Sequence, residues 1–245
     1  MTQARVIHPV IDLLRRPNGP RDRQLLFGDT VTVEDEQDGW SKITASKDGY
    51  QGWVAAEHLG LIEPQTHWIV AAATHAYERP DMKSRDRTSL SFGSKIRVLS
   101  EPDGFLETAL GFIPAVHAMP ASSRLTDPVA AAELFLGTPY LWGGNSRFGL
   151  DCSGLVQAAL LACGIPCPGD SGDQERELGQ LVPKSETEKR GDLLFWKGHV
   201  AWVAAENLLL HANASDMAVA LEPMDQAIAR IAAQGDGPVT AHKRL

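Results

Sequence analysis

The stretch Tyr140–Gln157, YLWGGNSRFGLDCSGLVQ, places one of only three cysteines between a glycine-containing segment and an apolar run. The three glycines before the cysteine, at positions 143, 144 and 149, allow sharp turns and the close approach of another backbone. Asp151 is a good N-cap residue, so a helix is expected to begin at Cys152. Unpaired amides and the helix dipole favour negative charge in the first helical turn. Because the thiolate is the nucleophilic form of cysteine, this position predicts a catalytic Cys152.

The apolar residues after Cys152 recur at helical spacing over residues 152–164, and residues 128–137 show similar spacing. Cys163 falls on the apolar stripe of the later helix, which predicts a buried core residue. At a rise of 1.5 Å per residue it would lie about 16 Å from Cys152, too far for a cross-link. Cys167, between two prolines, is expected in a loop.

A cysteine nucleophile needs a base, and the two candidates stand on expected strands. His199 opens the run HVAWV, and His211 follows twelve positions later on the run LLLHA, after a turn at 206–207. Adjacent antiparallel strands can bring the rings together, with His199 as base and His211 orienting it. A two-residue turn would pair His211 with Trp202, so the contact requires a longer loop or a bulge. Two other interpretations remain: one partly buried strand histidine with one surface histidine, or a Cys/His/His zinc site.

The N-terminal half predicts two diverged copies of a small antiparallel barrel or sandwich. Short β-branched runs alternate with turn pairs, and Gly28, Gly39 and Trp40 recur as glycine, glycine and phenylalanine at an offset of 65 positions. A later Gly-Trp-Val recurs as Gly-Phe-Ile at an offset of 59. The expected domains are residues 1–63, 64–119 and, after a linker rich in small residues and proline, 120–245. A cysteine-headed helix before an antiparallel sheet makes the last domain α+β.

Composition limits the function classes. The 245 residues are 43% hydrophobic and 22% charged, with a formal net charge of −8, which argues against nucleic acid or a membrane as partner. The N-terminal segment lacks a basic start followed by a long apolar run, and three cysteines suggest no disulfide framework, so the cytoplasm is expected. No nucleotide loop, haem motif or metal signature is visible, and we expect no cofactor and no metal.

The stretch 140–157, together with GDLLFWKGHVAWV and LLHAN, resembles the NlpC/P60 family of bacterial cell-wall cysteine peptidases from residue 125 onward. The pattern GD.V.V…DGW…GYxGWV makes the two β units similar to bacterial SH3-like domains. The resemblance implies a papain-like fold with Cys152 as nucleophile, His199 as general base and His211 as its orienting residue. It also implies that the Tyr140 hydroxyl serves the oxyanion site, with simple aromatic packing as the alternative.

Two SH3-like units before such a domain resemble the γ-D-glutamyl-L-diamino acid endopeptidases that recycle cell-wall peptides. This resemblance implies cleavage before meso-diaminopimelate or L-lysine in murein tripeptides or tetrapeptides that carry a free N-terminal L-alanine. Asp170 would bind the ammonium group beside Ser171, and Asp22 would add a second carboxylate, although a surface aspartate is an equal alternative. Motif positions suggest three further residues of the substrate pocket: Trp142, Ser153 and Tyr50.

Two other functions fit the same residues. One is a polymer-active wall hydrolase whose β units bind peptidoglycan strands. The other is a degraded family member that acts as a binding scaffold, although all three catalytic residue types are present.

Overall fold

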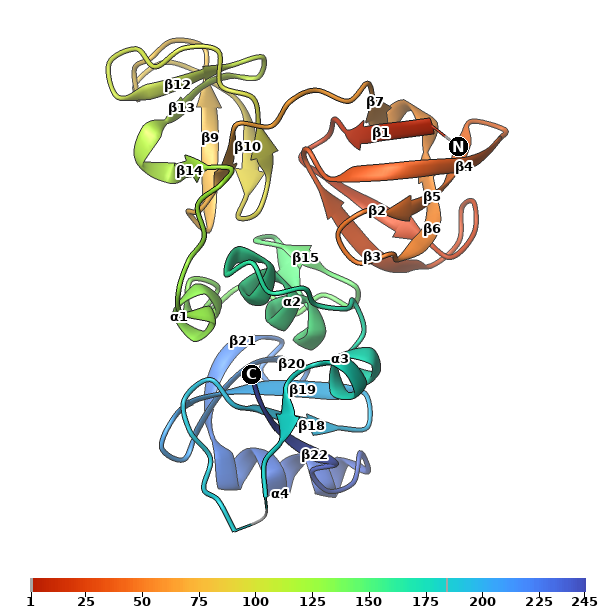
Figure 1. Ribbon diagram of the computed structural model, residues 1–245, viewed down its shortest axis with the longest axis vertical. Helices are drawn as coiled ribbons and strands as arrows, with labels where there is room; N and C mark the ends of the chain where they lie inside the picture. Colours follow the sequence, from red (N-terminus) through yellow and green to blue (C-terminus); the bar gives the residue numbers. More distant parts are fainter. Residues whose placement is uncertain (1, 184) are drawn as a thin grey trace. The chain divides into compact units, whose positions relative to one another are not determined.

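The computed structural model describes residues 2–183 and 185–245, and the chain divides into two compact units (Figure 1). The N-terminal unit holds Met1–Ser123 with Asn145–Arg147, and the C-terminal unit holds Arg124–Gly144 with Phe148–Leu245. Among the described helices, none has the length and apolar character that a membrane crossing requires.

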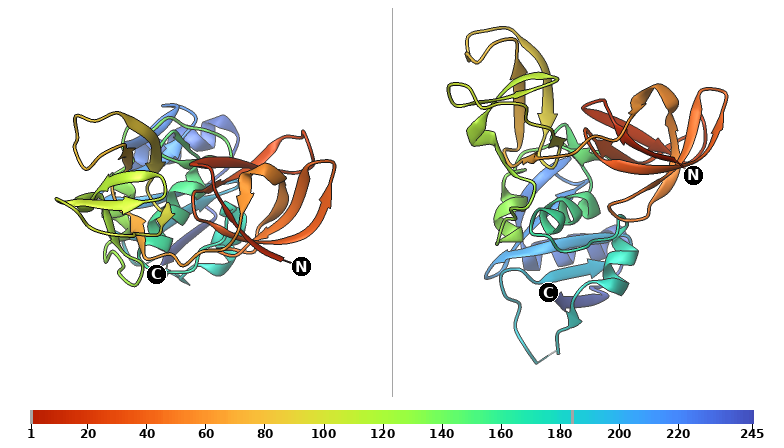
Figure 2. Two further views of the ribbon diagram at one scale, coloured as in Figure 1. Left: turned by 90° about the horizontal axis from the view of Figure 1, so that it is seen from above. Right: turned by 45° about the horizontal axis from the view of Figure 1, so that its top comes forward.

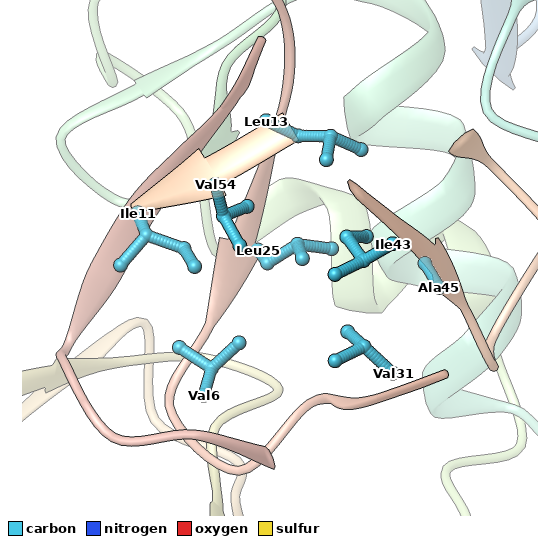
Figure 3. Close-up of a cluster of buried hydrophobic side chains, with 8 residues drawn as sticks. All are labelled: Val6, Ile11, Leu13, Leu25, Val31, Ile43, Ala45 and Val54. Carbon is cyan, nitrogen blue, oxygen red and sulfur yellow. The ribbon is translucent and has the colours of Figure 1, made fainter. Parts of the chain in front are cut away.

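The N-terminal unit begins with a seven-stranded antiparallel sheet in the order β3-β2-β6-β5-β4-β1-β7. Its elements are β1 (Thr2–Val6), β2 (Val10–Leu14), β3 (Arg21–Leu26), β4 (Thr30–Gln37), β5 (Trp40–Ala45), β6 (Gln51–Ala55), the 3-10 turn η1 (Ala56–His58) and β7 (Leu59–Gly60). Alternate residues of these strands point inward. They form the apolar cluster in Figure 3, which consists of Val6, Ile11, Leu13, Leu25, Val31, Ile43, Ala45 and Val54.

A second β region follows, made of a four-stranded sheet, β10-β9-β13-β12, and a three-stranded sheet, β11-β8-β14. Its elements are β8 (His67–Ile69), β9 (Ala73–Tyr77), β10 (Asp86–Ser91), β11 (Lys95–Ile96), β12 (Phe105–Thr108), β13 (Gly111–Pro114), the 3-10 turn η2 (Ala115–His117) and β14 (Ala118–Pro120). The unit also takes in β15 (Asn145–Ser146), where Asn145 exchanges two 3.2 Å hydrogen bonds with Gln24.

The backbone repeats its special conformations in the two β regions. Asp38 and Gly39 have φ of 50° and 80°, and Asp103 and Gly104 have φ of 49° and 78°. Glycine tolerates such left-handed angles and aspartate accepts them more readily than most residues, so the same Asp-Gly pair makes both turns. A 3-10 turn follows the last long strand of each region, η1 in the first and η2 in the second. These features match the internal repeat in the sequence.

The two β regions meet at Lys95. Its amide donates to the Phe27 carbonyl at 2.8 Å, and its ammonium lies 3.2 Å from the carboxylate of Asp29. Lys47 approaches the same carboxylate at 3.0 Å. Burial alone would raise the pKa of Asp29, but the two lysines and the Leu26 amide hold it well below its ordinary value. A buried charge is therefore matched by two cations.

The C-terminal unit is built on a six-stranded antiparallel sheet with the order β17-β22-β18-β19-β20-β21. Helix α4 packs on one sheet face through Ala227 and Ile231, and α2 lies along β19 and β20 (Figures 1 and 2). The strands are β16 (Gly149–Leu150), β17 (Gln180–Leu181), β18 (Leu193–Trp196), β19 (His199–Ala205), β20 (Leu208–Asn213), β21 (Ala218–Pro223) and β22 (Ala241–Arg244). The helices are α1 (Pro128–Glu133), α2 (Cys152–Ala162), α3 (Ser171–Glu177) and α4 (Met224–Gln234).

Two expectations about the helices need correction. Helix α1 ends at Glu133, four residues before the end of the predicted periodic segment. Helix α2 ends at Ala162, because Gly164 at φ 76° allows the chain to leave the helix while its amide bonds to Leu161 and that of Ile165 to Leu160. Cys163 is thus the C-cap and only half-buried, where the apolar stripe predicted a core residue.

The contact between the β regions gives a stability prediction. A Cβ on Gly28 would lie 2.2 Å from the Lys95 carbonyl oxygen, and φ is 81° there. We expect Gly28→Ala to lower the free energy of unfolding by about 3 kcal/mol, measured by urea denaturation. The control is Gly39→Ala, with φ of 80° and open space, which should cost only about 1 kcal/mol. Equal losses would show that the Lys95 contact is unimportant.

Candidate active site

Asp151 fixes the start of α2 and thereby the place of Cys152. One carboxylate oxygen accepts the Gly154 amide at 2.6 Å, as an N-cap does, and the other accepts the Gly143 amide at 3.0 Å. The same side chain thus ties the turn before the cysteine to the first turn of the helix. The Cys152 thiol is nearly buried, with its sulfur 3.9 Å from the carbonyl oxygen of Gly198, the residue directly before His199.

The two histidines share one sheet face because the β19–β20 hairpin contains a bulge. Ala205 pairs with Leu208, but Trp202 pairs with Leu210, so the register shifts by one residue around Ala204. Continuing this register sets His211 opposite Ala201, two residues from His199. Without the shift His211 would oppose Trp202 and point to the other face. The bulge that the contact was expected to need is present.

The rings of His199 and His211 meet directly. His199 Nε2 and His211 Nδ1 are 2.9 Å apart, and the ring centroids are 5.2 Å apart. His211 has no exposed surface, and His199 is partly buried beside Trp196. Neither ring is a surface histidine, so the interpretation as one partly buried and one surface histidine is wrong.

Glu222 and Arg230 extend this pair, and the sequence analysis did not find them. Glu222 Oε2 lies 3.0 Å from His211 Nε2. Arg230 donates to both Glu222 oxygens, from Nε at 2.9 Å and from Nη2 at 2.6 Å. The contact arises because Glu222 on β21 pairs with Leu209, two residues from His211 on β20. Only the strand register brings these residues together, so no local signal in the sequence marks them.

Burial keeps both imidazoles neutral. Desolvation, with further contributions from His211 and Arg230, lowers the pKa of His199 to about 3. Desolvation also lowers the pKa of His211, although Glu222 opposes the shift. A neutral ring has a nitrogen lone pair, so His199 is in the form that can accept a proton.

Tyr140 lies in the strand-like segment beside Leu150 and just before the turn that Asp151 holds. Its amide donates to the Met217 carbonyl at 2.8 Å, and it forms a parallel bridge to Leu150. Burial, followed by the charges of Cys152 and Asp151, raises the pKa of its phenol. The phenol therefore stays protonated and keeps a hydrogen to donate close to the cysteine.

Gln174 joins the first turn of α2 to the loop that carries Asp170 and Ser171. Its side-chain amide donates to the Ser153 carbonyl at 3.0 Å and to the Pro168 carbonyl at 2.9 Å, and it is fully buried. Asp170 is the exposed residue that precedes α3, and its backbone carbonyl accepts the backbone N–H of Gln174 at 2.9 Å. The structure thus fixes the Asp170 loop against the helix of Cys152. The polar sequence of α3 gave no sign of this role for Gln174.

The other expected pocket residues fall in both units. In the C-terminal unit Trp142 is 70% exposed, and the buried Ser153 hydroxyl lies 3.2 Å from an Asp151 oxygen. In the N-terminal unit Asp22 pairs with Arg15 at 2.7 Å, and the Tyr50 ring lies 5.9 Å from the Arg23 guanidinium carbon. The contribution of these four residues to a substrate pocket stays a prediction: Trp142, Ser153, Asp22 and Tyr50.

The zinc interpretation has little geometric support. His199 and His211 point ring nitrogens at each other at 2.9 Å and do not converge on a shared point. Within the described part of the chain, no three histidine, cysteine or acidic side chains gather as metal ligands would.

A cysteine at the start of a helix, with two strand histidines in contact, is an arrangement that suits a cysteine peptidase, and sequence comparison points to the same class. The pattern of the NlpC/P60 family matches residues 137–233, and that of the bacterial dipeptidyl-peptidase Sh3 domain matches residues 13–59. The γ-D-glutamyl-L-lysine dipeptidyl-peptidase of Bacillus subtilis (strain 168) is 31% identical over 84% of this chain and 76% of its own length. That of Bacillus cereus is 28% identical over 83% of this chain and 71% of its own length.

The chain belongs to the NlpC/P60 family and is a peptidase of the cysteine type. A crystal structure of an NlpC/P60 family protein from Bacillus cereus ATCC 10987 shares the fold, with a TM-score of 0.82 and 22% identity over 99% of both chains. The papain-like fold and an SH3-like domain at residues 13–59 follow from these matches.

The neutral histidines give a pH prediction. Because folding lowers the pKa of His199 below 6.5, the unfolded chain binds more protons than the folded chain below that pH. The free energy of unfolding should therefore rise with pH from about 5 to about 6.5. The slope should be smaller in His199→Gln, measured by urea denaturation at each pH.

The comparison has an internal control. Above about pH 7.5 these histidines are neutral in the folded and in the unfolded chain. The slopes of the wild-type protein and of His199→Gln should therefore agree there. Equal slopes at every pH would mean that His199 is not held neutral by the fold.

Gln174 gives a second prediction. Gln174→Leu removes the donor for the Ser153 and Pro168 carbonyls, so we expect the free energy of unfolding to fall by about 2 kcal/mol in urea denaturation. The control Glu177→Leu changes an exposed residue on the same helix and should stay within about 0.5 kcal/mol. A loss as small as that of the control would show that the amide does not fix this loop.

Proposed function

We propose that this cysteine peptidase hydrolyses the bond between γ-D-glutamate and an L-diamino acid, meso-diaminopimelate or L-lysine, in murein peptides with a free N-terminal L-alanine. Family membership and the names of the similar enzymes support a cell-wall peptide hydrolase. The observation that carries the catalytic part is the 2.9 Å contact between His199 and His211 beside the helix that begins at Cys152.

The proposed chemistry follows from these positions. His199 takes the proton of the Cys152 thiol, and the thiolate attacks the glutamyl carbonyl carbon. The Tyr140 phenol donates to the negative oxygen of the tetrahedral intermediate. His199 then returns the proton to the leaving amine, the C–N bond breaks and a thioester remains. Water, deprotonated by His199, hydrolyses the thioester and restores the thiol.

Substrate choice is assigned to the Asp170 loop. The exposed carboxylate of Asp170 suits the ammonium group of a free N-terminal alanine, and Gln174 holds this loop against the first turn of α2. A charge-assisted pair of this kind contributes roughly 1.5–3 kcal/mol and disfavours a peptide whose amine is acylated. Ser171, which begins α3, would add a hydroxyl beside it.

The remaining parts of the proposal concern the cellular location of the protein and the identity of its second β region. The described cysteines are all free thiols, which suits the reducing cytoplasm and a role in recycling wall peptides. The second β region would be a diverged SH3-like domain, which the repeated Asp-Gly turns and 3-10 turns support. Murein tripeptides or tetrapeptides would be the partners.

The test uses L-Ala-γ-D-Glu-meso-diaminopimelate beside its N-acetylated form, with products measured by mass spectrometry. We expect cleavage of the free-amine peptide alone and no cleavage by Cys152→Ala. Asp170→Asn should lower kcat/KM for the free-amine peptide about 10-fold to 100-fold and leave the thiol reactive toward iodoacetamide.

Each outcome bears on a separate part of the proposal. Activity in Cys152→Ala would overturn the catalytic assignment. Equal cleavage of both peptides would overturn the free-amine specificity, and loss of turbidity of purified cell walls would favour the polymer-active alternative. No cleavage, with no labelling of Cys152 by iodoacetamide, would favour the scaffold.

A further inference from the structure

His211 is fully buried, so both of its ring nitrogens need a hydrogen-bond partner. Nδ1 faces His199 Nε2 at 2.9 Å, and Nε2 faces Glu222 Oε2 at 3.0 Å. A carboxylate can only accept hydrogen bonds. The hydrogen of the neutral His211 ring must therefore lie on Nε2, where it is donated to Glu222.

The position of this hydrogen on His211 also determines which nitrogen of His199 carries a hydrogen. With its hydrogen on Nε2, His211 presents a lone pair at Nδ1 and accepts from His199 Nε2–H. The neutral His199 ring then has its lone pair on Nδ1. That nitrogen is the one left to take the thiol proton of Cys152, whose sulfur lies 3.9 Å from the carbonyl of the preceding Gly198.

Arg230 decides how firmly Glu222 is held. Its Nε and Nη2 bond to the two carboxylate oxygens at 2.9 and 2.6 Å, and this bidentate pair fixes the plane of the carboxylate. Arg230, chiefly through this hydrogen bond, keeps the pKa of Glu222 below its ordinary range, and His211 adds to the effect. Glu222 therefore remains an acceptor at neutral pH.

We propose that Glu222, held by Arg230, is a positioning residue that sets the tautomer of His211 and, through it, that of the base His199. The proposal rests on the assignment of Cys152 and His199 as nucleophile and base. Loss of Glu222 removes the acceptor at His211 Nε2 but leaves Arg230, which bonds to the same Glu222 oxygen, and a cation favours a lone pair on that nitrogen. The hydrogen of His211 then moves to Nδ1, His199 must accept at Nε2, and its Nδ1 carries a hydrogen that blocks proton transfer from the thiol.

The test compares Glu222→Leu with the wild-type protein by two readouts. Histidine-selective 15N NMR at pH 7.5, with the rings assigned from His199→Gln and His211→Gln, reports which nitrogen carries the hydrogen. We expect the hydrogen of His211 to move from Nε2 to Nδ1, and kcat on the tripeptide to fall roughly 10-fold to 100-fold while KM changes less than about 2-fold.

The matched control is Glu133→Leu, which breaks another carboxylate–arginine contact of the same unit, to Arg190 at 2.9 Å. It touches neither histidine, so kcat and both tautomers should stay as in the wild type. Loss of kcat in Glu222→Leu with an unchanged His211 tautomer, or a changed tautomer with full kcat, would overturn the proposal.

A second variant covers the case in which Glu222→Leu fails to fold. Glu222→Gln presents either its oxygen or its amino group to His211, and its kcat must follow the fraction of His211 that carries hydrogen on Nε2. A kcat independent of that fraction would overturn the proposal. Because the tautomers are read without substrate, a failure of the peptide assay in the wild type would count against the proposed function alone.

Discussion

The buried His211 ring is the constraint on which the candidate active site depends. A fully buried imidazole can keep both nitrogens satisfied only if a donor or acceptor stands at each end, and the cost of leaving one without a partner is about 1–3 kcal/mol. His199 and Glu222 fill the two ends from the strands on either side. Polar side chains of three adjacent strands thus form one line across the sheet, with the helix α4 supplying Arg230 at its outer end.

Cys152 is positioned by a second set of hydrogen bonds, which does not involve the histidines. Asp151 holds the helix start and the preceding turn, and Gln174 holds the Ser153 carbonyl against the next loop. The proposed nucleophile and base, Cys152 and His199, therefore come from elements that are each fixed by their own buried hydrogen bonds. Rigid placement of this kind holds reacting groups in the correct relative orientation before a substrate binds.

Local chemistry made part of this structure predictable from the sequence. Asp151 before an apolar run predicted the helix at Cys152, and the turn pairs between short β-branched runs predicted the turns that Asp-Gly makes in both β regions, because both signals depend on neighbouring residues only. The bulge at Ala204 was required by the histidine contact, but an alanine gives no sign of its place. Glu222 and Arg230 escaped notice because strand register and helix packing, not spacing, bring them to His211. The prediction that Cys163 lies in the core was wrong because Gly164 lets the chain leave the helix after Ala162, two residues before the end of the predicted segment.

The bulge in the β19–β20 hairpin also limits how this segment can change over evolution. Side chains alternate between the two faces of a strand, so each residue inserted into or deleted from the paired part of β19 or β20, with the turn unchanged, reverses the face on which His211 lies relative to His199. Changes within these strands that keep the two rings together must come in pairs, or be matched by the gain or loss of a bulge or of one turn residue. Whether the number of strand residues between His199 and His211 is even or odd therefore matters as much as the total spacing of twelve.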